Sequence, residues 1–292
     1  MSTVLVIAGS DSSGGAGITR DVRTLTQLGA RALCVVTAVT AQSHTQLSAT
    51  HIVPPELVQA QMAAALATCR PGAIKIGMLA TAATVLAVAA ALPSAGPPVV
   101  LDPVLASSSG GELLDSGGRA ALCATLLPRV TLLTPNIPEA AALIGSHAAR
   151  SEAQLLEQAA ALLALGPQAV LLKGGHAAGP EASDLLLTAH GTPHWLRAPR
   201  SSALRRGTGC ALSSAIAAGL ASGLPLTAAC ERAKQHVTQL LQHDHYHLTR
   251  QRAALRPSAR VSSQRDSCVC MPLRPRPGSA AASVNQHRAR AL

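Results

Sequence analysis

The sequence predicts an α/β protein with a mostly parallel central sheet and helices on both faces. Six short apolar runs are typical of strands, and they lie at residues 4–8, 32–37, 73–76, 99–101, 130–133 and 169–172. Runs without polar alternation are typical of strands buried on both faces, and strand–helix–strand order implies parallel neighbours. Two closely spaced runs, 183–189 and 192–197, predict an antiparallel hairpin at an edge of the sheet.

Helices are expected between the strands and after the hairpin. Ile18, Val22, Leu25 and Leu28 recur at helical spacing directly after the first strand. Further helices are predicted at residues 55–68, 82–92, 117–127, 137–144, 151–165, 209–222 and 225–242. We see no internal repeat and no linker in residues 1–249, so we expect one domain there.

The positive charge is concentrated at the C-terminal end. The chain of 292 residues has a net charge of +10, and residues 250–292 hold nine arginines against the single acidic residue Asp266. This segment is rich in Ser, Pro and Arg and lacks apolar periodicity, so residues 250–292 are predicted to be a disordered basic tail. The rest of the chain is nearly neutral and has one Trp, one Tyr and no Phe. A nucleic-acid partner is therefore disfavoured.

The cysteines and apolar segments bear on the cellular compartment. Seven cysteines occur without a CxxC pair, which is typical of reduced thiols. The N-terminal residues lack a basic leader, and four Pro and Gly residues interrupt the apolar region 79–101. We expect a cytoplasmic protein without a membrane partner.

The segment Arg-Gly-Thr-Gly-Cys at residues 206–210 precedes an apolar helix rich in small residues. Such a junction directs unpaired backbone N–H groups and the helix dipole at one point, where a phosphate fits. A simple tight turn is the alternative. Cys210 would lie in the first helical turn, where the same field is expected to acidify its thiol.

Polar or glycine-rich segments follow each predicted parallel strand, at residues 9–17, 42–44, 77–78, 102–103, 134–136 and 173–176. Because ligands of such sheets bind at the carboxyl ends of the strands, these segments are expected to form one site. The Walker pattern and the GxGxxG fingerprint are both missing, so P-loop and dinucleotide binding of the usual kind are disfavoured.

Several residues at this edge have two interpretations each. Asn136 and Glu139 fit a helix capping box, but Glu139 with Asp102 would also suit Mg²⁺ held largely through waters. Asp21 is either solvated or an acceptor for substrate groups. Lys173, one of three lysines, is either a surface residue or a compact charge for phosphate, and Lys75 is assigned no chemistry.

Together these segments resemble the hydroxymethylpyrimidine/phosphomethylpyrimidine kinase family of the ribokinase-like superfamily. The resemblance spans residues 4–240 in family order, and its matching segments are 7–18, 37–42, 74–79, 101–104, 133–140, 173–176 and 207–210. It implies a ribokinase-like three-layer α/β sandwich in which ATP and a pyrimidine meet at the sheet edge, with Mg²⁺. Oligomeric state cannot be read from the residues, so a homodimer is left open.

The resemblance also implies roles for individual residues. The positions that line the pyrimidine pocket in the family are Gly9, Asp21, Gln42, Met78 and Val104. Asp102 and Glu139 would lie by Mg²⁺, Asn136 and Lys173 would contact phosphates, and Gly207, Thr208 and Gly209 would form the anion hole. Cys210 stands where the wider superfamily has its catalytic Asp, and it is expected to accept the hydroxyl proton.

Two departures from the family pattern affect phosphate binding. Arg206 replaces the family's His before Gly-Thr-Gly-Cys, and Ser108 stands where a phosphate-binding Lys is usual. The monophosphate is therefore expected to be a poorer substrate here than the family resemblance would suggest. Two alternative functions are kept open: a kinase of pyridoxine-like or pyridoxal-like vitamins, and a catalytically weakened pyrimidine-binding protein.

Overall fold

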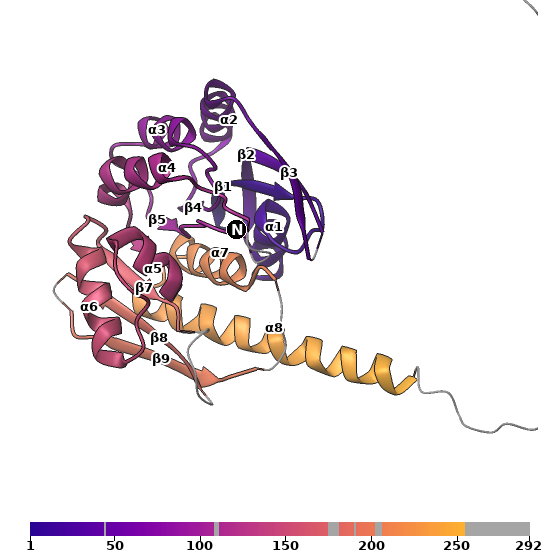
Figure 1. The fold of residues 1–292 in the computed structure, drawn as a ribbon. Helices are drawn as coiled ribbons and strands as arrows, with labels where there is room; N and C mark the ends of the chain where they lie inside the picture. The colour runs from indigo at the N-terminus through magenta and orange to yellow at the C-terminus, as the bar shows by residue number, and fades with distance from the viewer. Residues whose placement is uncertain (44, 108–110, 175–180, 190, 202–205, 255–292) are drawn as a thin grey trace, which may run out of the picture.

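The apolar runs predicted as strands all lie in one sheet. The computed structural model describes residues 1–43, 45–107, 111–174, 181–189, 191–201 and 206–254. Within these residues nine strands pair in the order β3-β2-β1-β4-β5-β6-β7-β8-β9 (Figure 1). Their bounds are β1 Thr3–Asp11, β2 Arg31–Gln42, β3 Leu47–Ile52, β4 Ala73–Ile76, β5 Val99–Leu101, β6 Leu132–Leu133, β7 Ala169–Leu172, β8 Glu181–Thr188 and β9 His194–Pro199.

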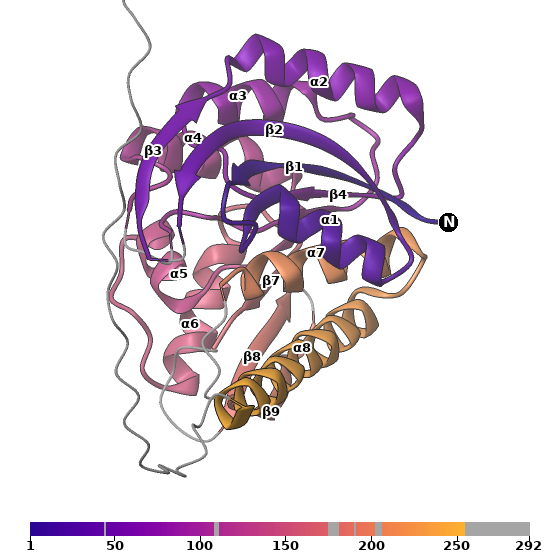
Figure 2. The same cartoon turned by 90° about the vertical axis from the view of Figure 1, so that its right-hand side faces the viewer.

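Helices cover both faces of this sheet, as predicted (Figure 2). Their bounds are α1 Gly17–Gln27, α2 Pro55–Thr68, α3 Ala82–Ala91, α4 Ser116–Ala121, α5 Ile137–Ile144, α6 Glu152–Leu163, α7 Thr208–Ala221 and α8 Leu226–Ala254. Helices α1, α7 and α8 contribute to the hydrophobic cluster on one face, and α2, α3, α5 and α6 contribute to the cluster on the other.

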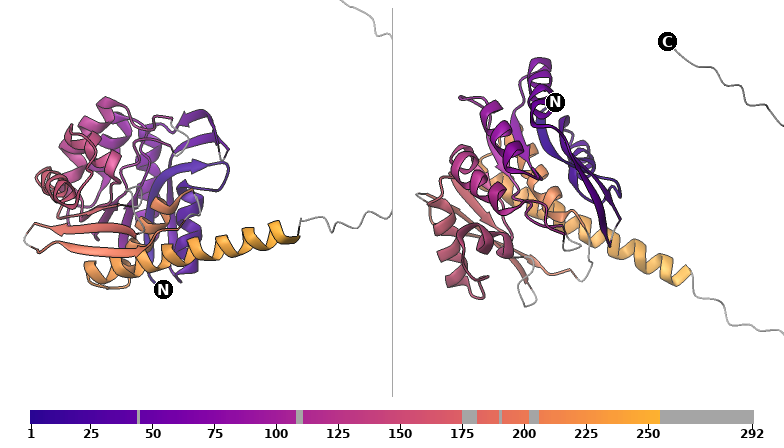
Figure 3. Two further views of the ribbon diagram at one scale, coloured as in Figure 1. Left: turned by 60° about the horizontal axis from the view of Figure 1, so that its bottom comes forward. Right: turned by 45° about the horizontal axis from the view of Figure 1, so that its top comes forward.

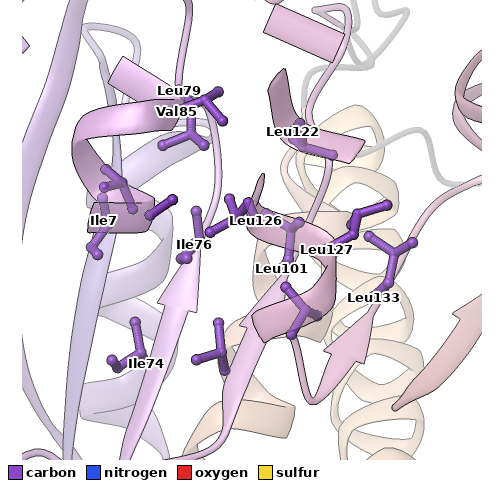
Figure 4. Packing of buried hydrophobic residues seen from close by; sticks show 14 of the residues in the cluster. Ile7, Ile74, Ile76, Leu79, Val85, Leu101, Leu122, Leu126, Leu127 and Leu133 are labelled. Carbon is purple, nitrogen blue, oxygen red and sulfur yellow. The ribbon is translucent and has the colours of Figure 1, made fainter. Parts of the chain in front are cut away.

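Alternation along the strands divides the apolar side chains between the two faces. In β1, Leu5 and Ile7 join the cluster beneath α2 and α3, whereas Val4 and Val6 join the cluster beneath α1 and α7. Figure 4 shows Ile7 packed in the first cluster with side chains from β4, β5 and the segment after α4. Because both faces are covered, these strands are apolar throughout, which is the pattern that predicted a parallel sheet.

Strands β1, β2, β4, β5, β6 and β7 pair in parallel, so their carboxyl ends lie at one edge of the sheet. The hairpin β8–β9 is antiparallel, as predicted, and α8 lies beside β9 (Figure 3). The segments after the parallel strands therefore converge, and they carry most of the candidate residues.

The structure adds one strand to the prediction and changes the bounds of several elements; the strand predicted at 32–37, for example, extends to Gln42 in β2. β3 was missed because it is an exposed edge strand without a buried face. The strand predicted at 130–133 is reduced to β6, and the helix predicted at 117–127 is α4 followed by a π turn (Leu122–Leu126) and a 3-10 turn (Leu127–Arg129). Pro128 cannot continue an α-helix. Helix α8 runs past the predicted end at 242 because residues 243–254 hold no Gly or Pro.

Helix α8 also extends into the segment predicted to be a disordered tail, since it ends at Ala254 rather than before residue 250. The remaining predicted tail, 255–292, lies outside the described residues. In the part of the chain that the structure describes, no helix is long and apolar enough to span a membrane.

Candidate active site

The predicted junction of a glycine turn and a helix is present at the start of α7. Gly207 precedes the helix with φ +73°, in the left-handed region that favours glycine. A Cβ on Gly207 would overlap the carbonyl oxygen of Gly15, so the turn packs directly on the loop after β1. The first-turn N–H groups of α7 have no intrahelical acceptor, which leaves them available to an anion.

Three charged side chains from different strand ends meet beside this turn. Lys173, after β7, lies with its Nζ 2.7 Å from Asp102 Oδ1 and 3.9 Å from Glu139 Oε2. Asp102 follows β5, and Glu139 lies in the first turn of α5. A Cβ on Gly209 would lie 3.2 Å from Lys173 Nζ and 3.4 Å from Asp102 Oδ2. The helix start and the charged cluster therefore form one site.

Glu139 forms the predicted capping box, and its carboxylate also faces the charged cluster. The capping box is complete: the Glu139 N–H donates to Asn136 Oδ1 and the Asn136 N–H donates to Glu139 Oε2, both at 2.8 Å. The same carboxylate faces Lys173 and lies near Asp102. Burial, with a smaller contribution from Asp102, raises the pKa of Glu139 to about 7 against the opposing effects of Lys173 and the Asn136 N–H. Two nearby carboxylates that share one lysine are a donor set suited to a hard divalent cation.

Lys173 is not the surface residue of the alternative interpretation. Its side chain is 13% exposed. Burial alone would lower its pKa, but Asp102 and Glu139 outweigh that effect and hold the pKa of Lys173 above its usual value. The backbone of Lys173 is also fixed, because its N–H donates to Pro135 O at 2.8 Å. Lys173 is thus a compact, positioned cation.

Cys210 lies in the first turn of α7, as predicted, but its expected acidity is wrong. Burial raises the pKa of the Cys210 thiol to about 11. Lys75 and the Gly17 backbone N–H lower this pKa, and the carboxylates of Asp21 and Asp102 raise it. The helix field is therefore outweighed by desolvation and by two nearby negative charges.

Asp21 lies beneath this site in a buried ion pair. The side chain is completely buried, so the solvated alternative is wrong. Its Oδ2 lies 2.9 Å from Lys75 Nζ, and its Oδ1 accepts a hydrogen bond from Ser214 Oγ at 2.8 Å. Direct contact between Asp21 and a substrate stays a prediction. Both carboxylate oxygens already have a protein partner, so a substrate group would have to share one of them.

Lys75 and Ser214 are functional candidates that the sequence reasoning missed. Lys75 is completely buried in β4, on the same face as Ala73 and therefore beneath α1 and α7. Ser214 lies one helical turn after Cys210. The sequence did contain an indication of this pair: Lys75 is a single lysine in an apolar strand, and a buried ammonium needs a carboxylate partner.

The predicted pyrimidine-binding residues lie at the same edge of the sheet. Gly9 and Met78 are in contact: a Cβ on Gly9 would lie 2.8 Å from Met78 Sδ. Gln42 ends β2, and its N–H donates to Ser12 Oγ at 2.8 Å. Val104 follows the Asp102–Pro103 pair at the end of β5. These residues come from the ends of β1, β2, β4 and β5.

Of the two departures from the family pattern, the structure describes Arg206 and not Ser108. Arg206 Nη1 donates to the carbonyl oxygen of Ser43, and Nη2 lies 3.5 Å from Asp11 Oδ2. Asp11 also accepts hydrogen bonds from the N–H groups of Ser13 and Ala16. Arg206 therefore connects the turn before α7 to the ends of β1 and β2.

Among the described residues, no group of three or more His, Cys, Asp or Glu side chains is arranged to hold a metal. The pair Asp102–Glu139 stays the predicted Mg²⁺ site. The cysteines in the part of the chain that the structure describes are free thiols: Cys34, Cys69, Cys123, Cys210 and Cys230.

The sheet topology and the site at its carboxyl edge define a kinase of the ribokinase-like class, and comparisons with solved structures agree. A phosphomethylpyrimidine kinase of Clostridium difficile 630 has a TM-score of 0.73 and 34% identity, covering 82% of this chain and 100% of that one. The pyridoxal kinase of Staphylococcus aureus in complex with AMP-PCP and pyridoxal has a TM-score of 0.73 and 29% identity, covering 80% and 85%.

Sequence comparisons narrow this class. The profile of the phosphomethylpyrimidine kinase family matches residues 11–255. The hydroxymethylpyrimidine/phosphomethylpyrimidine kinase of Rhizobium meliloti is 43% identical over 236 residues, which cover 80% of this chain and 88% of that protein. The chain belongs to the phosphomethylpyrimidine kinase family and is an ATP-dependent kinase.

Proposed function

We propose that this protein phosphorylates 4-amino-5-hydroxymethyl-2-methylpyrimidine with ATP and then phosphorylates the monophosphate to the pyrophosphate, in thiamine biosynthesis. The observation that carries the proposal is the convergence of Cys210, Asp102 and Lys173 at the start of α7 in a chain of this family. Positioning and electrostatics dominate phosphoryl transfer, and this cluster offers both.

The transferring phosphoryl group is proposed to bind at the N-terminus of α7. The backbone N–H groups at Gly207, Thr208 and Gly209 donate to its oxygens, and Lys173 adds a positive charge. Asn136 uses its side-chain oxygen in the capping box, so its amide nitrogen is the group left to donate to a phosphate. Asp102 and Glu139 would hold Mg²⁺, which supplies charge neutralisation on the phosphate oxygens when bound.

In the first step, the hydroxymethyl oxygen forms a bond to the γ-phosphorus, the bond from that phosphorus to the ADP oxygen breaks, and ADP leaves. The proton of the hydroxyl group passes to the Cys210 thiolate. Because burial raises the pKa of Cys210 to about 11, only a small fraction of the enzyme holds the thiolate at neutral pH. In the second step the acceptor is a phosphate monoester, which needs no base.

The pyrimidine is proposed to bind against Gly9, Gln42, Met78 and Val104, with Asp21 beneath them. The contact between Gly9 and Met78 supports a pocket in which the backbone approaches a flat ring closely. The pocket has few aromatic partners to offer, since the chain has one Trp and one Tyr. We also propose that the enzyme works in the cytoplasm, an assignment supported by its free thiols.

A pyridoxal kinase is the second candidate function, because the Staphylococcus aureus pyridoxal kinase has a similar fold at 29% identity. A coupled assay of ADP release should compare hydroxymethylpyrimidine, its monophosphate and pyridoxal as acceptors. We expect the highest kcat/KM with the two pyrimidines. A preference for pyridoxal would reverse the assignment, and binding of the pyrimidine without turnover would favour the weakened binding protein.

A further inference from the structure

Helices α1 and α7 lie side by side with their N-termini at the same end, and their residues meet in register. The Gly17 N–H hydrogen bonds to Cys210, and one turn further along each helix Asp21 accepts the hydroxyl of Ser214. Gly17 and Asp21 are four residues apart on α1, and Cys210 and Ser214 are four residues apart on α7. Each helix therefore presents its two residues on the face that meets the other helix. The proposed base and the buried carboxylate therefore belong to one row of contacts.

Lys75 extends beneath this row from β4. Its ammonium lies 2.9 Å from Asp21, and a Cβ on Gly77 would lie only 2.8 Å from it. The ammonium is thus at the carboxyl end of the strand, directly behind the segment that carries Met78. An isolated charge in this completely buried position would be costly, so the ion pair with Asp21 is what retains it.

We propose that Lys75 is a positioning residue for phosphoryl transfer: it holds α1 on α7 through Asp21 and Ser214, and it places a buried positive charge beneath the row of contacts that includes Cys210. This inference rests on the proposed role of Cys210 as the base.

The charges around Cys210 come from four elements, and their signs make the proposal testable. Lys75 on β4 and Lys173 after β7 favour the thiolate, whereas Asp21 on α1 and Asp102 after β5 oppose it. Loss of Lys75 should therefore reduce the reactivity of Cys210, and loss of the Asp21 charge should increase it. A purely structural ion pair would give changes of the same sign, because either substitution breaks the same contact.

The test measures alkylation of Cys210 by iodoacetamide at pH 8.5 in the ligand-free enzyme, by mass spectrometry of the peptide that contains it. We expect Lys75→Met to slow alkylation and Asp21→Asn to accelerate it, each by roughly three- to tenfold. Lys234→Met is the matched control, because it breaks another lysine–aspartate pair, the partly buried Lys234–Asp184 pair between α8 and β8 (2.7 Å), and it should leave the alkylation rate of Cys210 unchanged.

Equal or same-sign changes in the two variants would overturn the proposal. If Lys75→Met does not fold, Asp21→Asn decides alone, and an unchanged or slower rate contradicts the inference. The alkylation needs no substrate, so its outcome is independent of which acceptor the enzyme prefers. In turnover, Lys75→Met should reduce kcat of the first phosphorylation more than kcat of the second.

Discussion

The ammonium of Lys173 lies 2.7 Å from the carboxylate of Asp102, although β6 separates the two strands that carry them. Both side chains follow the carboxyl ends of parallel strands, and a Cβ on Gly209 would contact both. This pair forms the charged side of the proposed phosphate site and lies against the start of α7. Because residue 209 is a glycine, the backbone of α7 can approach the two charged groups closely.

Gly209→Ala tests that close approach. The new Cβ would lie 3.2 Å from Lys173 Nζ, so the ammonium must move by a few tenths of an ångström, and it would touch Asp102 Oδ2 at 3.4 Å. We expect kcat to fall by about 10²-fold, as misplaced catalytic groups typically cause, while the thermal midpoint changes little. Gly117→Ala in α4 is the control, because its Cβ would meet Asp115 at an ordinary 3.6 Å. Equal activity in both variants would contradict the geometry.

Glu139→Gln should change how stability depends on pH in metal-free buffer with EDTA. Burial raises the pKa of Glu139 from 4.5 to about 7, so the folded state holds its proton more tightly than the unfolded state. The wild type should therefore lose stability relative to Glu139→Gln as pH rises from 4.5 to about 7. Gln retains the capping box. Urea midpoints measure this difference, and a constant difference across that range would refute the assignment.

Substitutions of Ser108 and Arg206 test which residues bind the acceptor phosphate in the second phosphorylation. Ser108→Lys restores a cation for an acceptor phosphate of about −1.5 to −2 charge, so it should improve the second step about ten- to a hundredfold more than the first. Arg206 already contacts Asp11 and Ser43. If Arg206 nevertheless reaches the acceptor phosphate, Arg206→His will impair the second step instead. Unchanged step ratios in both single variants would remove these residues from phosphate binding.

Truncation after residue 254 tests the domain boundary. We propose that the kinase domain needs no part of 255–292, since this basic segment lacks a core-forming pattern and the family profile ends at 255. Because α8 continues to Ala254, the deletion should start there and not at residue 250. Thermal midpoint and kcat should match those of the full chain. An insoluble or inactive truncated protein would show that the segment packs on the domain.

The arrangement of the sheet was predictable because its strands are buried on both faces and therefore apolar throughout. β3 was not, since an exposed edge strand leaves no such pattern. The site was predictable as a set of strand-end segments, and Lys173, Asp102 and Glu139 do come together. The pKa of Cys210 was not predictable. The sequence shows that Cys210 lies at a helix N-terminus, but its burial and the ion pair between Asp21 and Lys75 depend on tertiary packing.

The role of Cys210 is tested most directly by measuring both phosphorylations in Cys210→Ala across pH. For the wild type we expect the rate of the first step to rise with pH through the neutral range, because the pKa of Cys210 is raised to about 11. The variant should lose roughly 10²-fold in the first step together with that pH dependence, and it should retain the second step. Equal losses in both steps, or a first step near the wild-type rate, would contradict the assignment of Cys210 as the base.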